Sequence, residues 1–235
     1  MELLKKLLSV RNIVLSEQQN RQFNRYYEEL IEWNKRINLT GITDENEVAV
    51  KHFYDSLTAS FDLPFAGPLR VCDVGSGAGF PGIPLKILFP DLKLTIVDSL
   101  EKRLKFLDHL TDALDLQQVS LEHERAETFG HRKDAREQFD LVLARAVAPL
   151  SVLSEYCLPL VRIGGFLVAM KGLNAAQETA DAGQAIEKLG GMVDRTMNLE
   201  LPYHMGSRTI IIIKKMRPTP ARYPRKPGIP ARKPL

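Results

Sequence analysis

Long hydrophobic runs are missing from this 235-residue sequence, and cysteine is scarce. No apolar run approaches the roughly 20 residues that a membrane-spanning helix needs, so no membrane segment is expected. The start, MELLKKLLSV, is interrupted by two lysines, which makes it a poor signal peptide and favours a short amphipathic helix. The two cysteines, Cys72 and Cys157, provide no disulfide framework. The expected location is therefore the reducing cytoplasm.

Several catalytic and metal-binding patterns are also absent. The five histidines form neither an HExxH motif nor a Cys/His cluster, so no metal site is expected. The chain has no G-x-S-x-G sequence, which excludes the nucleophile elbow of serine hydrolases. A phosphate-binding Walker loop is excluded because Ile83 and Pro84 follow Gly82, where that loop requires Lys and Ser or Thr.

Acidic residues are missing from the end of the chain. Residues 214–235 hold eight lysines and arginines and six prolines, although the whole chain has a formal charge of only +3. Because proline opposes regular secondary structure, this segment is predicted to be extended and basic. It is either a disordered, solubilising end or a basic arm that binds nucleic acid.

The most informative stretch that is present is VCDVGSGAGFPGIP, at residues 71–84. Residues 69–74 form an apolar run of strand length, and residues 83–89 indicate a helix with proline in its first turn. Between them, glycines stand at every second position from 75 to 79. Glycine lets the backbone turn sharply and approach a ligand, and the start of a helix offers N–H donors with partial positive charge. The pattern predicts a nucleotide site.

Two kinds of nucleotide fit this loop. Residues 77–82 match the dinucleotide fingerprint G-x-G-x-x-G, which would make the protein an NAD(P)-dependent oxidoreductase. Asp73, just before the first glycine, fits S-adenosylmethionine (SAM) better, because the amino-acid part of SAM carries an ammonium group and no pyrophosphate. We therefore expect a SAM site.

About 60 residues of predicted helix precede the loop. Ser16 and Gln19 form a plausible capping box for a helix that ends near residues 40–41. A second helix is predicted from Asp44, and it contains His52 and Asp55. This pair is either a solvated, hydrogen-bonded pair or part of the mouth of the site. Residues 62–68, with two prolines and a glycine, indicate a linker.

Beyond the linker, predicted strands and helices alternate. Strands are expected at residues 69–74, 93–97, 119–123, 139–144, 165–170, 192–199 and 209–213, and helices at 82–89, 102–116, 151–161 and 175–189. This alternation predicts a doubly wound α/β fold with a parallel sheet covered on both faces. No crossover helix separates the last two strands, so they are expected to pair antiparallel, as in the Rossmann-like class I SAM-dependent methyltransferases.

The chain is thus divided into three parts. Residues 1–62 are an N-terminal helical extension, residues 63–216 a SAM-dependent methyltransferase domain, and residues 217–235 a basic, proline-rich C-terminal tail.

Polar residues at the carboxyl ends of the strands are the site candidates, because ligands bind beyond that edge of open α/β sheets. Asp98 lies 19 residues after Gly79, the spacing of an acid that accepts hydrogen bonds from ribose hydroxyls, although it is alternatively a helix N-cap. Glu127, after the third strand, either binds the adenine edge or is a solvated loop acid.

Two basic residues end later strands. Arg145 ends a buried strand, where an unpaired guanidinium is costly. It either pairs with a carboxylate such as Asp73 or Asp98, or contacts a cofactor or phosphate. Lys171 either meets RNA phosphate or caps its strand.

Taken together, these residues resemble one family, ribosomal RNA small subunit methyltransferase G, formerly called glucose-inhibited division protein B. The resemblance spans nearly the whole chain. It is carried by WNKRINLT at residues 33–40, HFYDS at 52–56, DVGSGAGFPGIPL at 73–85, DSL at 98–100, Arg103 with Phe106 and Leu107, and ARA at 144–146. The tail from Tyr223 looks like that of Gram-positive members.

The resemblance implies a class I SAM-dependent enzyme that methylates N7 of guanosine 527 in 16S rRNA, with 16S rRNA or the 30S subunit as its partner. In the family's pattern the cofactor-binding positions fall here on Gly75, Phe80, Ala126, Glu127 and Arg145. The loop and strand ends add Asp73, Ser76, Gly77, Gly79 and Asp98. RNA contact is expected from Lys171, Arg208, Lys215, Arg222, Arg225 and Lys226. Nothing in the sequence calls for more than a monomer.

The chemistry agrees with the residues. N7 of guanine carries a lone pair and no proton, so its methylation needs no general base, and rate comes from positioning and electrostatics. Asp55 and Asp73 are candidates to stabilise the cationic product, N7-methylguanosine. The non-enzyme alternative is an RNA-binding ribosome assembly factor with a vestigial fold.

Overall fold

The computed structural model describes residues 1–61, 63, 65, 67–172 and 174–235. Within these residues, seven strands form one sheet with the order β3-β2-β1-β4-β5-β7-β6. The strands are β1 (Arg70–Val74), β2 (Lys93–Asp98), β3 (Val119–His123), β4 (Phe139–Arg145), β5 (Val161–Lys171), β6 (Gly191–Glu200) and β7 (Ser207–Lys215). The first five strands are parallel, and β7 is antiparallel to both β5 and β6. The predicted antiparallel end of the sheet is confirmed.

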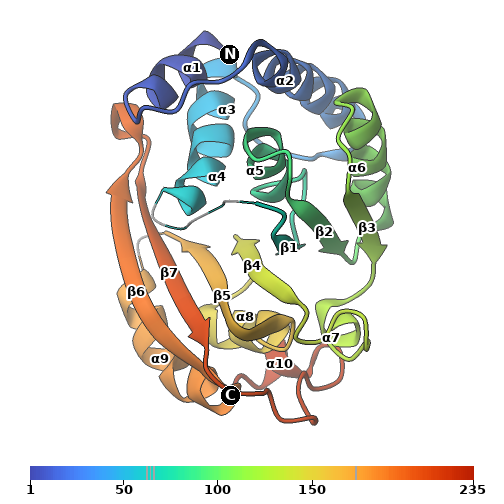
Figure 1. Ribbon diagram of the computed structural model, residues 1–235, viewed down its shortest axis with the longest axis vertical. Helices are drawn as coiled ribbons and strands as arrows, with labels where there is room; N and C mark the ends of the chain where they lie inside the picture. Colours follow the sequence, from blue (N-terminus) through green and yellow to red (C-terminus); the bar gives the residue numbers. More distant parts are fainter. Residues whose placement is uncertain (62, 64, 66, 173) are drawn as a thin grey trace.

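Helices cover both faces of the sheet (Figure 1). One face carries the N-terminal helices with α5 (Gly82–Leu88) and α6 (Glu101–Ala113). The other carries α7 (Ala126–Phe129), α8 (Leu150–Cys157), α9 (Ala175–Lys188) and α10 (Ile229–Arg232). The four isoleucines at positions 210–213 show why: Ile210 and Ile212 enter the core on one face, and Ile211 and Ile213 enter the core on the other. A strand buried on both faces is apolar throughout.

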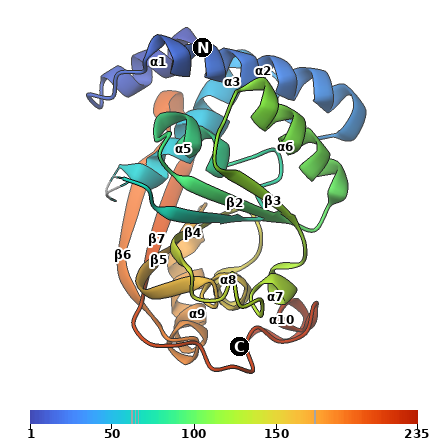
Figure 2. The same ribbon diagram turned by 45° about the vertical axis from the view of Figure 1, so that its right-hand side comes forward.

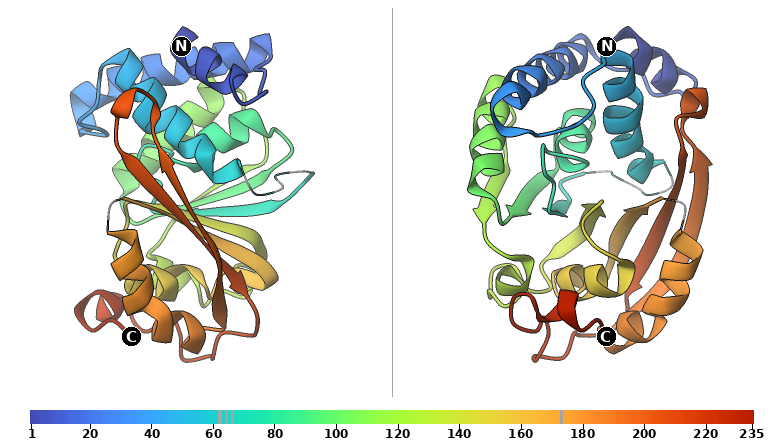
Figure 3. Two further views of the ribbon diagram at one scale, coloured as in Figure 1. Left: turned by 90° about the vertical axis from the view of Figure 1, so that its left-hand side faces the viewer. Right: turned by 180° about the vertical axis from the view of Figure 1, so that it is seen from behind.

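The N-terminal helices share the core of the first face. They are α1 (Glu2–Ser9), α2 (Glu17–Ile37), α3 (Glu45–Val48), the π-helix η1 (Ala49–Tyr54), α4 (Asp55–Leu57) and the 3₁₀-helix η2 (Thr58–Ser60). The predicted capping box of α2 is present, with Ser16 Oγ accepting from Gln19 N and Gln19 Oε1 accepting from Ser16 N. The β6–β7 hairpin, with η3 (Pro202–His204) at its tip, extends to the N-terminal helices (Figure 3).

Two helix predictions need correction. The helix predicted at residues 151–161 ends at Cys157, and Val161 already begins β5. Pro159 is the physical reason, because proline has no backbone N–H to donate and its ring clashes with the preceding turn of a helix. The second N-terminal helix, predicted as one regular helix from Asp44, changes from α to π geometry, returns to an α-helical turn in α4 and ends in 3₁₀ geometry.

The expectation of a tail without regular structure is also wrong. Residues 229–232 form α10, and Tyr223 and Pro230 are buried. Proline at the start of so short a helix costs no hydrogen bond, because the first N–H groups of any helix lack intrahelical partners. The tail runs below the helices of the second face, and α10 packs against α8 (Figure 2). Of the predicted linker at residues 62–68, positions 62, 64 and 66 lie outside the described residues.

No helix in the described part of the chain is both long and apolar enough to cross a membrane. Both cysteines are buried and free.

Candidate cofactor and acceptor site

The glycine loop turns from β1 into α5 with three glycines in the left-handed region, Gly75, Gly77 and Gly79. A Cβ at Gly75 would lie 2.9 Å from Val147 Cγ2, and one at Gly79 would lie 2.7 Å from the hydroxyl of Tyr26. Both positions therefore require glycine for conformation and for space. The predicted strand–turn–helix is confirmed.

Asp73 lies beneath this loop and is fully buried. Its Oδ2 accepts a 2.7 Å hydrogen bond from Gly82 N at the start of α5, whereas Oδ1 has no partner among the described residues. Burial raises the pKa of Asp73 to about 7, and the Gly82 hydrogen bond opposes that shift. Asp73 thus supports the loop from below through Oδ2, and its Oδ1 is left as an acceptor without a partner among the described residues. The buried hydroxyl of Ser76, in the loop, is likewise unpartnered within the described residues.

A first cavity of about 340 Å³ opens at the carboxyl ends of the strands. Its walls come from the loop, the end of β2, the start of α7, the turn after β4 and α8. The lining residues that matter most are Gly75, Asp98, Ala126, Glu127, Val147 and Tyr156. Its position is that of a nucleotide site in a doubly wound fold.

Asp98 is organised by backbone donors inside this cavity. Its Oδ1 accepts from Leu100 N at 2.9 Å, and its Oδ2 accepts from Gly77 N at 3.3 Å and from Arg103 Nη1 at 3.4 Å. The N-cap of α6 is Leu100, so Asp98 does not occupy that position. Asp98 ends β2, as the sequence predicted for the second strand, while its link to Arg103 became visible only in the structure.

Glu127 is a buried carboxylate in the wall of the first cavity, 3% exposed. It belongs to α7, a four-residue helix that the sequence analysis did not anticipate. Its Oε1 accepts a 2.9 Å hydrogen bond from the backbone N–H of Gly228, in the C-terminal tail. The tail therefore contacts a residue in the wall of the first cavity, although it follows the last strand.

A second cavity of about 600 Å³ adjoins the first, and Ala146 and Val147 line both. Four of its lining residues are cationic and two are acidic: Lys51, Arg145, Lys171 and Arg208 face Asp55 and Glu178. Ala146 stands between the cavities with φ of 56°, a conformation uncommon for a residue with a Cβ. Two pockets that share one wall suit a donor and an acceptor of a transferred group.

Asp55 joins the two arginines of the second cavity. Its Oδ2 accepts from Arg145 Nη1 at 3.2 Å and from Arg208 Nε at 3.0 Å. Neither of the partners suggested for Arg145 from the sequence, Asp73 and Asp98, forms an ion pair with it in the described structure. The π-helix η1 leads directly into Asp55, and such irregular turns are frequent at functional sites.

Phe80 connects the loop to the second cavity. Its ring stacks on His52, with centroids 4.6 Å apart, and the Arg145 guanidinium lies 5.0 Å from its centroid. Burial, followed by the positive charge of Arg145, lowers the pKa of His52 to about 4. His52 is therefore neutral at physiological pH and contributes a ring face, with its Nε2 against the hydroxyl of Thr40 at 2.7 Å.

The expected RNA-binding cations fall into separate places. Lys171 and Arg208 line the second cavity, paired with Glu178 and Asp55. Lys215 is buried and does not fit a surface role. In the tail, Arg225 is paired with Glu155, whereas Arg222 and Lys226 are exposed.

Some residues of the two cavities were not predicted from the sequence. Tyr156 lines the first cavity from α8, and Lys51 lines the second. Neither has a sequence signal of its own. Ala146 had one, because ARA was recognised as a motif without a role for its last residue.

The fold is that of the class I SAM-dependent methyltransferases. Solved structures agree at the level of fold. A ribosomal protein L11 methylase from Lactobacillus delbrueckii has a TM-score of 0.55 and 16% identity over 71% of this chain and 79% of that chain. A SAM-dependent methyltransferase from Aquifex aeolicus has a TM-score of 0.53 and 18% identity over 72% and 93%.

The particular family follows from the sequence comparisons. The profile of the GidB family, rRNA small subunit methyltransferase G, matches residues 19–205. The chain is 53% identical to ribosomal RNA small subunit methyltransferase G of Bacillus cytotoxicus, over 100% of this chain and 98% of that protein. It is 55% identical to the protein of that name from Geobacillus kaustophilus, over 97% and 96%. The chain belongs to the rRNA small subunit methyltransferase G family and is a methyltransferase, and the resemblance drawn from its motifs is confirmed.

Proposed function

We propose that this protein transfers a methyl group from SAM to N7 of a guanosine in 16S rRNA, the guanosine at position 527. The observation that carries the proposal is the pair of cavities that meet at Ala146 and Val147. One has the acidic residues and glycine loop that suit the cofactor, and the other has the cations that suit a nucleotide of a polyanion.

The residues of the first cavity fit SAM by the chemistry of their donors and acceptors. Asp98 presents a carboxylate to ribose hydroxyls, and Glu127 presents one to the adenine edge. Beneath the loop, the unpartnered Oδ1 of Asp73 is an acceptor for the ammonium group. When bound, SAM supplies an electrophilic methyl group on a sulfonium.

The second cavity fits the acceptor nucleotide. Lys51, Lys171 and Arg208 line it and suit phosphate oxygens, while Asp55 holds Arg145 and Arg208 in place. N7 of guanine needs no deprotonation, and neutral His52 agrees with a site that moves no proton. The protein's contribution is to align the acceptor with the donor across the shared wall.

Asp55 and Asp73 differ in what they can do for the cationic product. Asp55 is already paired with two arginines, so its main effect is to position them. Asp73 is buried near the loop with its pKa raised, and it becomes a carboxylate most readily when a cation lies beside it.

The test is methyl transfer from labelled SAM to 30S subunits that lack the modification, followed by mapping of the labelled base. Label at N7 of guanosine 527 supports the proposal. SAM binding without transfer to rRNA would leave an assembly factor as the better description. Binding of NADH in place of SAM would favour the oxidoreductase reading of the same glycines.

The proposed binding of RNA by the second cavity has its own test. Replacement of Lys51 by alanine should weaken binding to 30S subunits and reduce the salt dependence of that binding by about one phosphate contact. Replacement of Lys35, an exposed lysine on α2 paired with Glu32, serves as the matched control. An identical loss in both variants would remove the second cavity from RNA recognition.

A further inference from the structure

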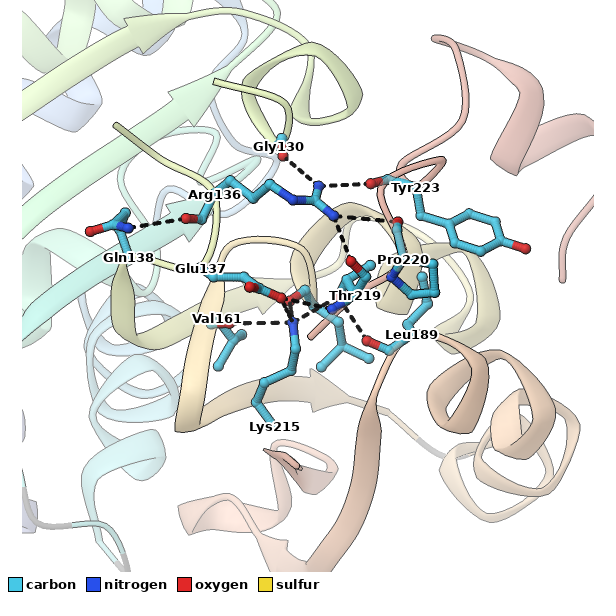
Figure 4. A network of polar contacts seen from close by, with 11 residues as sticks. Gly130, Arg136, Glu137, Gln138, Val161, Leu189, Lys215, Thr219, Pro220 and Tyr223 are labelled. Carbon is cyan, nitrogen blue, oxygen red and sulfur yellow. Dashed lines mark hydrogen bonds and ion pairs between the residues drawn. The ribbon is translucent and has the colours of Figure 1, made fainter. Parts of the chain in front are cut away.

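The C-terminal tail, residues 217–235, is attached to the methyltransferase domain by buried polar groups at its root. Lys215 Nζ, at the end of β7, donates to the carbonyl oxygens of Leu158 and Val161 and to Thr219 Oγ1 at 2.7 Å (Figure 4). Glu137 pairs with Lys215 at 3.1 Å and accepts from Thr219 N at 2.7 Å. The first turn of the tail is thereby fixed to the end of the sheet.

A single guanidinium continues the attachment. Arg136 donates to the carbonyl oxygens of Gly130, Thr219 and Tyr223, at 3.1, 2.8 and 2.8 Å (Figure 4). Arg136 precedes β4 and Gly130 follows α7, so this contact joins the tail to the segment that carries the wall of the first cavity. Buried carbonyl groups without such donors would be costly.

The tail then packs against α7 itself. His131 Nε2 lies 2.6 Å from the carbonyl oxygen of Pro224, and a Cβ at Gly130 would lie 2.8 Å from Pro224 Cγ. The contact is close enough to require glycine at position 130. The Gly228 N–H donor reaches Glu127, whose carboxylate lines the first cavity.

Arg225 makes the parallel connection to α8. Its backbone N–H and its guanidinium both donate to Glu155, which is fully buried, with Arg225 Nη2 to Glu155 Oε2 at 2.6 Å. The next residue, Tyr156, lines the first cavity. A charge-assisted, bidentate pair of this kind fixes geometry as well as adding stability.

We propose that the tail is a strap that supports the wall of the cofactor site from behind and sets its affinity for SAM, with Gly228 and Arg225 as positioning residues for Glu127 and Tyr156. The inference rests on the proposed use of SAM in the first cavity. It assigns to the tail a role other than that of an RNA-binding arm. Because coupling between two binding events is reciprocal, docking of the tail favours SAM and SAM favours docking of the tail.

Two shortened chains separate the key contact from the rest of the tail. A chain that ends at Lys226 keeps Arg225 and loses the Gly228 donor, whereas a chain that ends at Ile229 keeps both. We expect the dissociation constant for SAM, measured by calorimetry without RNA, to rise about tenfold in the first, as expected for loss of a hydrogen bond to a charged group. In the second it should change by less than about twofold.

Kinetics distinguish a positioning role from general damage. In the chain that ends at Lys226, KM for SAM should rise while kcat at saturating SAM and KM for 30S subunits stay within about twofold, because only cofactor positioning is lost. Far-ultraviolet circular dichroism checks that both shortened chains are folded.

The intact protein provides a test that does not depend on truncation. Amide hydrogen exchange at residues 225, 226, 228 and 229 should slow when S-adenosylhomocysteine is added. Unchanged exchange at these residues, or unchanged SAM affinity in the folded chain that ends at Lys226, refutes the proposed role of the tail. Loss of 30S binding with a smaller salt slope, at constant SAM affinity, would make the tail an RNA arm instead. Failure of the intact chain to bind SAM would refute the proposed function itself.

Discussion

Arg208 Nε lies 3.0 Å from Asp55 Oδ2, and this contact joins the hairpin end of the sheet to the N-terminal helices across 153 positions of sequence. Asp55 is 2% exposed and also holds Arg145. One carboxylate therefore compensates two guanidinium groups at the bottom of the second cavity. The N-terminal extension is thus part of the second cavity, because it supplies the counter-charge for two partly buried cations.

Replacement of Asp55 by asparagine should destabilise the protein by about 3 kcal/mol, because it leaves a buried guanidinium without a counter-charge. Urea unfolding measures the free energy of unfolding. The matched control is Glu32→Gln on the exposed face of α2, which should not measurably change that free energy. If both variants have the stability of the unmodified protein, Asp55 does not stabilise the fold as the counter-charge of the two arginines.

Asp73 should make SAM affinity depend on pH. Its pKa is raised to about 7, so the carboxyl is largely protonated at pH 6, and a bound ammonium group favours the ionised form. Binding of SAM at pH 6 should release close to one proton and should tighten as pH rises to 8. Calorimetry in buffers of different ionisation enthalpy measures the proton count. Asp73→Asn should abolish the proton release, and persistence of the release in that variant would assign it to another group.

The same carboxyl gives a stability prediction of defined sign. Because the folded pKa of Asp73 exceeds the ordinary value of 3.8, the folded state binds more protons than the unfolded state between about pH 4 and 7. The contribution of Asp73 to stability should therefore be largest below pH 4 and be lost as pH rises through 7. The difference between the unmodified protein and Asp73→Asn, followed by urea unfolding across this range, isolates the contribution. A difference that grows more favourable to the unmodified protein with rising pH would contradict it.

Lys215→Met should cost about 1–3 kcal/mol of unfolding free energy, since Leu158 O, Val161 O and Thr219 Oγ1 lose their donor in a buried site. Burial lowers the pKa of Lys215 to about 8, so the unfolded chain binds the proton more tightly than the folded protein does. In the unmodified protein, the free-energy cost of burying the charged lysine therefore decreases as pH rises above 8. The control is Lys214→Met, one position earlier and partly exposed. Equal stability losses at positions 214 and 215 would show that the buried network is not responsible.

Gly75→Ala should weaken SAM binding, because it places a methyl group 2.9 Å from Val147 and forces a positive φ of 72° on a residue with a Cβ. The left-handed backbone conformation alone costs a residue with a Cβ about 1–2 kcal/mol. The control is Gly183→Ala in α9, where nothing lies within 4 Å and helix propensity should raise stability by up to about 1 kcal/mol. Unchanged SAM affinity in folded Gly75→Ala would show that the loop does not approach the cofactor.

The sequence was sufficient for the order of the seven strands and of the longer helices, and for the glycine loop; the short helices α7 and α10 were not predicted. Those features depend on local patterns: the apolar runs of β1 and β4, the alternating glycines, and the capping box at Ser16. The predicted ends of helices and strands were wrong where a single residue determines them, as Pro159 does between α8 and β5. Candidate residues at strand ends, such as Asp98 and Arg145, could be chosen because parallel strands bring their carboxyl ends to one edge.

What the sequence by itself determined was the class of fold, the place of the nucleotide loop and the residue types available to the site. What only the tertiary structure decided was which charges meet. The sequence presented residues 217–235 as an extended basic tail, either disordered or binding nucleic acid, whereas the fold pairs Arg225 with Glu155 and places the Gly228 N–H against Glu127. The reason is physical: whether a cation binds RNA or an internal carboxylate depends on distances between segments far apart in the chain. Local sequence does not encode those distances.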